Sequence, residues 1–120
     1  MTWEISFHDK FLPEFYELTT EVQDEILAHA KLLESEGPLL RRPHADTLKG
    51  SRHKNMKELR FYADDGVWRV AFAFDPEKKA ILLIAGNKAG ISEKRFYKQL
   101  IAKADARFDS HLDELKEKGE

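Results

Sequence analysis

The amino-acid sequence predicts a single α+β domain in which helices pack on one face of a mostly antiparallel sheet. Three strand-like segments follow one another between residues 57 and 85, with only short turns between them. Helical periodicity occurs before and after this region, in residues 20–36 and 92–115. Because strands joined by tight turns pair antiparallel, we expect the order strand, helix, helix, three strands, helix.

Length and composition support one folded domain over residues 1–120. A chain of 120 residues can build one packed core and is short for two. Eight phenylalanines, two tryptophans and a hydrophobic content of 42% favour a globule over disorder. There is no cysteine, hence no disulfide framework and no thiolate metal site. We find no signal segment or transmembrane stretch and expect a cytoplasmic protein with no membrane partner.

The chain begins with a short strand and a short helix. Apolar and polar residues alternate at the start, as in a strand, with the apolar positions at Trp3, Ile5 and Phe7. Asp9 can cap the helix that follows, provided that Pro13 lies in its first turn. The apolar residues of this helix are Phe11, Phe15 and Leu18.

The second helix has the clearest local signals. Thr20 and Gln23 form a capping-box pattern, with a hydroxyl at the cap and an amide three residues later. Gly37 provides the left-handed exit and Pro38 follows it, which together end the helix. The predicted apolar stripe consists of Val22, Ile26, Ala30 and Leu33.

The central part of the chain predicts a loop and three strands. Residues 38–56 hold two of the four prolines and much of the basic charge, which is typical of a loop. Strands follow at about 57–63 and 67–74, and a turn begins at Asp75. Residues 80–85 are apolar at both odd and even positions, which indicates a strand covered on both faces.

Ser92 is predicted to cap the last helix, whose apolar residues recur every three or four positions. That helix could run about 25 residues, given the length of its pattern. Such a helix would overhang a domain of this size beyond Asp105, so about 106–120 is expected to form a tail that frays or docks a partner.

The two strands at 57–63 and 67–74 have a register that can be read from side-chain parity. If the loop is the tightest one, centred on Asp64 and Asp65, Arg60 lies directly opposite Arg69 on the outer face. Like charges in such a pair destabilise a sheet. Two facing arginines therefore point to an anion, phosphate above all. Glu58 lies on the same face and is the competing explanation, since it could pair with one arginine.

The outer face and the charge distribution favour a polyanion-binding surface. Ala71 and Ala73 share the face with the arginines, and we expect them to leave it shallow and concave rather than covered by a second core. Residues 37–61 hold seven lysines and arginines against two acidic residues, a local balance of +5 in a chain of net charge −2. A local patch can steer a polyanion even when the whole molecule is mildly acidic, although a basic loop can also be simply solvated. The basic residues that could contact RNA are Arg41, Arg42, Lys49, Arg52, Lys54 and Lys57.

Taken together, these segments resemble the RelE/ParE superfamily of type II toxin–antitoxin toxins, and more closely its HigB-like, phage-derived branch. The order and spacing of the segments carry this resemblance, because each one is short. The matching segments are residues 49–51, 57–61, 68–70, 86–88 and 92–104.

The resemblance implies a ribosome-dependent mRNA endoribonuclease that uses no metal and no small-molecule cofactor. The substrate's own 2′-hydroxyl attacks the neighbouring phosphate, so the protein must orient that attack and stabilise the added charge. On this basis Arg69 matches the family's phosphate clamp, while Arg60 and Lys88 match basic positions around it. Tyr97 falls near the family's C-terminal aromatic residue, which stacks on a base or transfers a proton; it could equally be a packing residue.

The sequence departs from its RNA-cleaving relatives just before Arg60. Those relatives often alternate two lysines there, whereas this chain has Lys57 and Glu58. Lys57 falls on the same face of the strand as the core residues. Glu58 lies on the outer face and could be a general base or a salt-bridge partner. His53 could supply acid–base chemistry from the neighbouring loop, or be merely solvated. We predict no metal site.

Two functions remain open at this level. The first is the endoribonuclease, held inactive by a cognate helix-turn-helix antitoxin. The second is a non-nuclease member of the superfamily that acts by binding, as a ParE-like gyrase poison or as an antitoxin partner and co-repressor. Arg60, Arg69 and Lys88 on one predicted face favour the first, whereas Glu58 and the acidic net charge favour the second.

Overall fold

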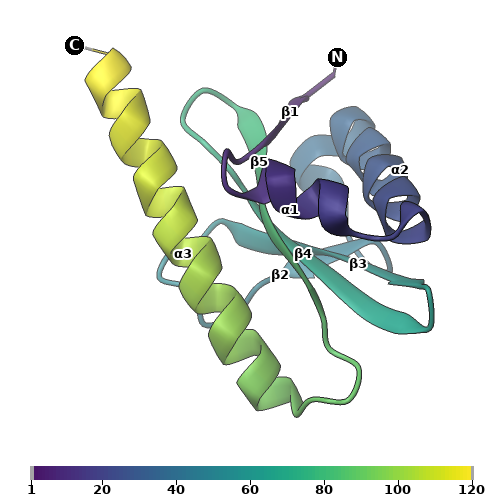
Figure 1. The fold of residues 1–120 in the computed structure, drawn as a ribbon. Coiled ribbons are helices and arrows are strands. Elements are labelled where there is room, and N and C mark those ends of the chain that lie inside the picture. The colour runs from purple at the N-terminus through teal and green to yellow at the C-terminus, as the bar shows by residue number, and fades with distance from the viewer. Residues whose placement is uncertain (1, 120) are drawn as a thin grey trace.

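The structure is a computed structural model that describes residues 2–119 of the chain. It confirms the predicted α+β class, with a five-stranded, mostly antiparallel sheet (Figure 1). No helix within residues 2–119 combines the length and the apolar character needed to cross a lipid bilayer. The elements are β1 (Glu4–Phe7), α1 (Phe11–Glu17), α2 (Thr20–Glu36), the 3-10 turn η1 (Gly37–Leu39), β2 (Ala45–Thr47), β3 (Met56–Ala63), β4 (Gly66–Phe74), β5 (Lys79–Asn87) and α3 (Glu93–Lys118).

The strand order in the sheet is β1-β5-β4-β3-β2. The β1 strand runs parallel to β5, and all other neighbours are antiparallel. The β2 strand was not predicted, because residues 38–56 were expected to form a loop. It has only three residues and no alternating pattern, and it is a strand because its backbone pairs with residues 57–59 of β3.

The predicted hairpin register is confirmed. Arg60 lies opposite Arg69, and Phe61 lies opposite Trp68. Asp64 and Asp65 both have positive φ angles, 51° and 57°. Two consecutive left-handed residues make the two-residue turn whose twist suits a tight hairpin. The alternation of side chains along the two strands, together with the shortest possible loop, therefore predicted the register correctly.

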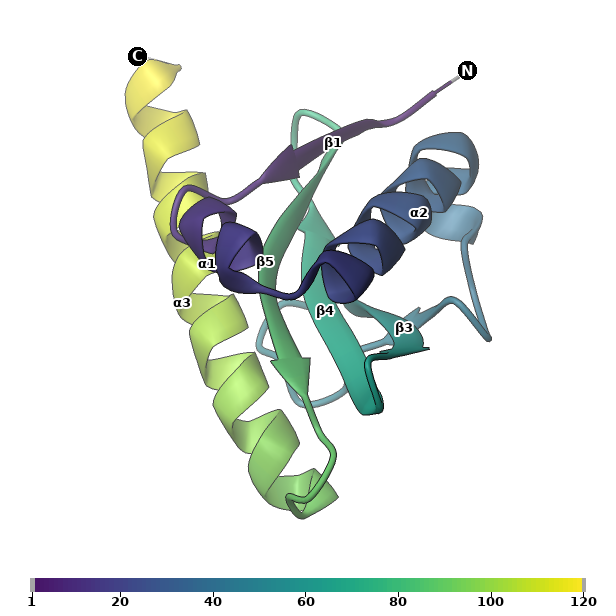
Figure 2. The same cartoon turned by 45° about the vertical axis from the view of Figure 1, so that its right-hand side comes forward.

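One face of the sheet packs against α1 and α2. Buried residues of β3 and β4 meet buried residues of the two helices there, in a core that includes Leu59, Val70, Phe72, Phe11, Ile26 and Leu33. Figure 2 shows both helices on this side of the sheet. Burial of apolar surface of this kind is the main force that holds the layers together.

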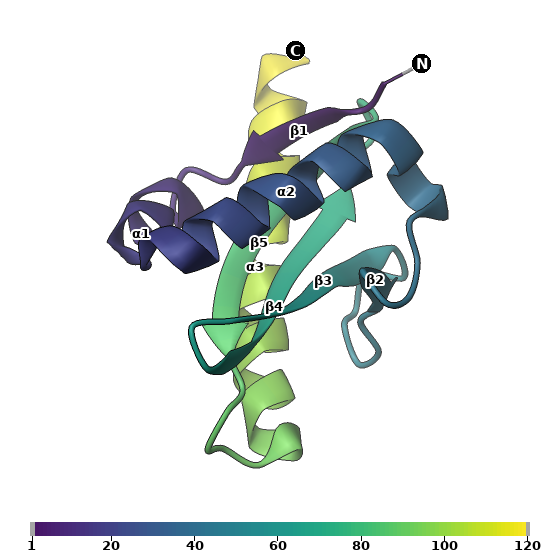
Figure 3. The same ribbon diagram turned by 90° about the vertical axis from the view of Figure 1, so that its right-hand side faces the viewer.

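The opposite face is covered by α3, so helices lie on both faces and not on one as predicted. Ala71 and Ala73 are fully buried in a second core, where Phe96, Leu100 and Ala104 of α3 contact the sheet. Figure 3 shows α1 and α2 in front of the sheet and α3 behind it. The two alanines do not leave a shallow surface. Their small side chains allow a helix to approach closely, and the apolar stripe of α3 needs a partner to leave water.

The helix termini follow the sequence signals with small shifts. Ser92 caps α3, accepting from the Arg95 backbone N–H (3.3 Å). Gly37 ends α2 with a φ of 55°, as its position predicted. The α2 cap is Thr19, not Thr20, and the Gln23 side chain donates to the Leu18 carbonyl (2.8 Å). The α1 cap position is Lys10, not Asp9, and no side chain caps it.

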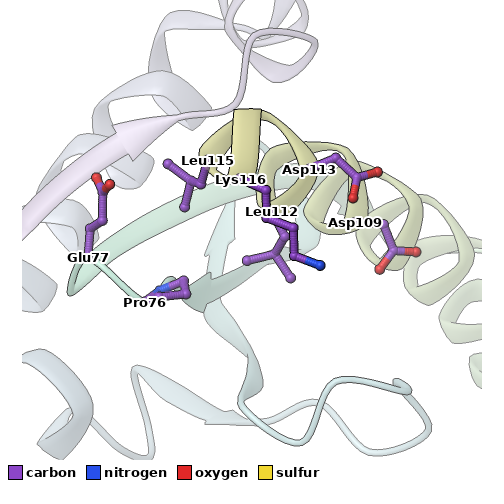
Figure 4. A pocket seen from close by; sticks show the side chains of 7 residues that line it. All are labelled: Pro76, Glu77, Asp109, Leu112, Asp113, Leu115 and Lys116. Atoms are coloured by element: carbon purple, nitrogen blue, oxygen red, sulfur yellow. The ribbon is translucent and has the colours of Figure 1, made fainter. Parts of the chain in front are cut away.

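Contacts between α3 and the rest of the domain continue past Asp105. Arg107 donates from Nη1 and Nη2 to the two carboxylate oxygens of Glu14 in α1, at 2.8 and 2.6 Å, and from Nη1 to the Leu83 carbonyl (2.8 Å). His111 Nε2 lies 2.8 Å from Asp75 Oδ2. Beyond these contacts, Leu112 and Leu115 line a pocket beside Pro76 of the β4–β5 turn (Figure 4). The last turns of the helix thus lie against that turn.

We expect Phe72→Ala to lower the free energy of unfolding by about 3–5 kcal/mol, the usual cost of removing a buried phenyl ring. Phe72 is fully buried between the sheet and the two N-terminal helices. Urea denaturation measures the change. Leu39→Ala is the control, because Leu39 is 81% exposed. An unchanged free energy of unfolding in Phe72→Ala would contradict this packing.

A second prediction concerns the contact between α1 and α3. The hydrogen bond from Arg107 holds the pKa of Glu14 below its ordinary value of 4.5. A lowered folded-state pKa stabilises the fold above the unfolded pKa, and this stabilisation is lost as pH falls through the folded pKa. Arg107→Met should therefore raise the Glu14 pKa in an NMR titration. The stability gap between wild type and variant should narrow on acidification; a gap independent of pH would contradict the pairing.

Candidate functional site

Four polar side chains form one connected group between the sheet and α3, which we call the Glu58 cluster: Glu58, Arg60, Arg69 and Tyr97. The Tyr97 hydroxyl donates to Glu58 Oε1 (2.8 Å) and accepts from Arg69 Nε (3.1 Å). Arg60 donates to Glu58 Oε2 (2.8 Å). Glu58 and Arg69 are only 3% and 2% exposed. The cluster therefore holds three ionisable partners around a carboxylate that is nearly out of water.

The sheet register and the position of α3 explain this arrangement. Glu58 and Arg60 lie two residues apart on β3 and so share a face. Arg69 joins them from the opposing position on β4. Glu58 lies opposite Ala71, whose small side chain leaves room for a carboxylate. The first turns of α3 then bring Tyr97 over the group.

Glu58 supplies the anion that the facing arginines require. Its carboxylate lies 2.8 Å from Arg60 and 3.8 Å from Arg69 Nε. The arginine pair therefore does not by itself demand an external phosphate. The expectation that Arg69 lies off the packed part of the domain also needs correction, because its side chain is buried and donates to the Trp68 carbonyl (2.9 Å).

The phenol of Tyr97 stays protonated at physiological pH. Burial raises the pKa of its phenol above the ordinary 10.0, and the hydrogen bond to Glu58 raises it further. Arg69 acts in the opposite direction without reversing the shift. The hydroxyl can thus give a hydrogen bond, or a proton, to an acceptor that replaces Glu58.

Lys88 lies beside the cluster, directly after β5. Its ammonium group is 5.8 Å from the centre of the Tyr97 ring and 3.0 Å from Glu93 Oε1. The hydrogen bond from Lys88 lowers the pKa of Glu93. The structure therefore brings Lys88 to the predicted neighbourhood but pairs it with a carboxylate of α3.

His53 is not brought to the cluster. Its Nε2 lies 2.7 Å from Asp109 Oδ1, and its ring packs on Phe108. Asp109 is twelve residues beyond Tyr97 on α3, which corresponds to about 18 Å along a helix. The same aspartate binds Arg52, so this histidine and this arginine hold the β2–β3 loop against α3.

The other basic candidates divide among separate surfaces. Lys49 and Lys54 are exposed on the β2–β3 loop, near the Arg52 contact. Lys57 lies on the α2 side of the sheet, 3.5 Å from the Pro38 carbonyl. Arg41 and Arg42 are exposed before β2, and Arg42 pairs with Asp46 at 2.9 Å.

A pocket at the edge of β3 contains residues that sequence reasoning missed. Its lining joins two arginines of the Glu58 cluster to side chains of α2 and of the segment before β2, in the set His29, Arg42, Pro43, His44, Arg60, Phe61, Tyr62 and Arg69. The available signal was the alternation that places Tyr62 on the outer face with Arg60. Nothing local in the sequence pairs His29 with His44, fifteen residues away. Within residues 2–119, no group of three or more candidate side chains is arranged to hold a metal ion.

Comparison with known proteins assigns the family. Residues 13–109 match the family described as phage-derived protein Gp49-like. A putative toxin HigB2 of Mycobacterium tuberculosis is 47% identical over 96 residues, which cover 79% of this chain and 47% of that protein. A putative toxin HigB3 of the same organism is 43% identical over 98 residues, or 82% and 83% of the two chains. The chain thus matches about half the length of the first relative.

Solved structures show the same fold. A mutant of the E. coli toxin RelE in its free state has a TM-score of 0.61 at 14% identity, covering 86% of this chain and 97% of its own. RelE in an archaeal RelE–RelB complex from Pyrococcus horikoshii has a TM-score of 0.54 at 20% identity, with coverages of 75% and 99%. The sequence matches show that the chain belongs to the Gp49-like phage-derived family and is HigB-like, and the solved structures show that it has the fold of RelE.

Proposed function

We propose that this protein is the toxin of a type II toxin–antitoxin pair and that it cleaves mRNA on the ribosome. The Glu58 cluster carries the proposal, because it combines two arginines, a carboxylate and a protonated phenol within hydrogen-bonding reach of one another. Cleavage by the substrate's 2′-hydroxyl is promoted by charge stabilisation, a proton acceptor and a proton donor, and the cluster offers a group for each. The reaction as proposed uses only side chains and the RNA itself.

Each member of the cluster has a distinct role in this mechanism. Arg69 and Arg60 bind the scissile phosphate and neutralise the charge added when the 2′-oxygen attacks. Glu58 accepts the proton of the attacking hydroxyl. Tyr97 donates its proton to the departing 5′-oxygen, for which its raised pKa keeps it protonated. Lys88 adds positive charge at the margin of the site.

The free protein holds its arginines on Glu58, so the phosphate must exchange with the carboxylate. Arg60 is the more accessible of the two, with a side chain 19% exposed against 3% for Arg69. Arg60 can therefore turn outward to a phosphate first. Loss of the contact with Arg60 leaves Glu58 Oε2 free to accept a proton, as a general base must.

A cognate antitoxin would hold the toxin inactive. The support is that the relatives carry the name of HigB toxins and that one neighbour of the same fold was solved as a RelE–RelB complex. We propose a small antitoxin with a helix-turn-helix DNA-binding domain, encoded beside this chain.

The alternative is a toxin or co-repressor that acts by binding without cleaving RNA. The observation in its favour is the closed state of the cluster, in which one buried carboxylate neutralises both arginines. Mapping mRNA cleavage by primer extension decides between the two functions.

Arg69→Ala should reduce mRNA cleavage by about 10²–10³, the usual effect of removing a donor that stabilises transition-state charge. Cleavage is mapped by primer extension in a reconstituted translation system, with and without translating ribosomes. Arg95→Ala is the matched control, because Arg95 is exposed on α3 and outside the cluster.

Arg69 is buried, so circular dichroism must show that the variant is folded before its activity is interpreted. Arg69→Lys, which keeps the charge but not the planar fork, provides a second variant. A folded Arg69→Ala that cuts like wild type would contradict the clamp. Intact mRNA with folded wild-type protein would instead favour the binding-type function.

Titration of Tyr97 tests the role of proton donor. Its phenolate absorbance should appear at a pH above 10.0, measured as the difference between wild type and Tyr97→Phe. Because the folded-state pKa is raised, the hydrogen bond to Glu58 stabilises the fold below the unfolded pKa and is lost as pH rises through the folded one. A Tyr97 that ionises below 10.0 would contradict the assigned environment.

A further inference from the structure

The pocket at the edge of β3 exists because β2 is short. The pairing of β2 with β3 stops at Ala45 opposite Leu59, and one further hydrogen bond joins the Arg60 N–H to the His44 carbonyl (2.9 Å). Pro43, just before, has no N–H with which to continue the ladder. Within residues 2–119, no strand pairs with this edge of β3 from Phe61 onward.

The pocket combines aromatic walls with a cationic rim. Its rings are His29, His44, Phe61 and Tyr62, and its charges are Arg42, Arg60 and Arg69. The His29 ring centre lies 5.2 Å from that of Phe61 and 5.3 Å from that of His44. Tyr62 is 76% exposed, so its ring faces solvent beside the arginines. Exposed rings next to arginines are typical platforms for unstacked bases.

Hydrogen bonds assign which nitrogen of each imidazole carries the proton. His29 Nδ1 lies 2.9 Å from the Glu25 carbonyl, which can only accept, so this nitrogen carries the proton. In neutral His29 the Nε2 atom is then an acceptor. His44 Nδ1 lies 3.4 Å from it and must be the donor. The Nε2 atom of neutral His44 is left as an acceptor with no protein partner among the described residues.

We propose that this pocket binds the nucleobase adjacent to the scissile phosphate, and that His44 Nε2 accepts a hydrogen bond from an exocyclic amino group on that base. The proposal rests on the nuclease function above and specifies how the substrate is selected. Adenine, cytosine and guanine each present an exocyclic amino group on the Watson–Crick edge, whereas uracil presents only an N–H between two carbonyls. The pocket should therefore favour the bases that carry an amino group, such as adenine and cytosine, over uracil.

Two arginines connect this pocket to the reaction site. Arg60 and Arg69 line the pocket and also belong to the Glu58 cluster. A nucleotide whose phosphate lies on these guanidinium groups would thus have its base within reach of Tyr62 and His44. The competing interpretation is a plain anion site, in which the arginines bind phosphate and the rings do not take part.

Binding of free nucleotides tests the pocket without requiring catalysis or a ribosome. We would follow the side-chain resonances of His44 and Tyr62 by NMR while adding AMP, CMP, UMP or inorganic phosphate. AMP or CMP should bind up to about tenfold more tightly than UMP, the factor that one net hydrogen bond supplies. Phosphate should leave the Tyr62 ring resonances unshifted.

Variants separate the two contacts. His44→Ala should remove the preference among bases. Tyr62→Ala should weaken the binding of every nucleotide by about tenfold, because base stacking is lost. His111→Gln is the control, since it removes an imidazole of α3 that contacts Asp75 and lies outside the pocket. In the cleavage assay, His44→Ala should redistribute the cuts among bases.

Three results would overturn the proposal: nucleotides and phosphate that perturb the pocket equally, an unaltered base preference in His44→Ala, or no shift at His44 and Tyr62 with any nucleotide. These outcomes are distinct from failure of the nuclease function. If the protein binds AMP in the pocket but leaves mRNA intact, the base site stands and the nuclease function is wrong. If His44→Ala cleaves mRNA at the same sites as wild type, the nuclease function stands and the base site is wrong.

Discussion

The buried carboxylate of Glu58 is the interaction on which the rest of the site depends. Two arginines face each other across β3 and β4, which alone would destabilise the hairpin. Glu58 compensates both, and Tyr97 completes its hydrogen bonds from α3. Removing one partner from such a group leaves a buried charge without compensation, which costs far more than the group adds to stability when intact. Sheet register, helix position and candidate chemistry are therefore tied together at one residue.

Sequence reasoning identified the hairpin but misplaced α3, and the difference has a physical cause. Register follows from two strictly local constraints, the period of two along a strand and the geometry of a two-residue turn. The position of α3 depends on which distant surface accepts its apolar stripe. Ala71 and Ala73 are compatible with an open face and with a closely packed helix. The stripe formed by Phe96, Leu100, Ala104 and Phe108 was the better guide, because it required a buried face of its own.

The same distinction divides the site residues. Glu58, Arg60 and Arg69 could be predicted together because strand parity and hairpin register fix their relative positions. Tyr97 was placed near them only through resemblance to the family, since nothing local positions a helix residue over a sheet. His53 was predicted from its loop position, but Asp109 holds it elsewhere. The pairing of His29 with His44 joins α2 to the segment before β2, and only the folded chain reveals it.

In the proposed mechanism, the closed cluster of the free protein is an inactive arrangement that the substrate itself opens. The arginines prefer the partner with the greater negative charge, and the attacked phosphate gains charge as the reaction proceeds, whereas Glu58 loses its own when it accepts the proton. Transfer of the arginines from Glu58 to the phosphate therefore becomes more favourable along the reaction. One exchange provides the phosphate with its counter-charge and frees the carboxylate to accept the proton. The departure from two lysines to Lys57 and Glu58 is then compatible with a nuclease, because the carboxylate gives the arginines a temporary anion and the attacking hydroxyl a base.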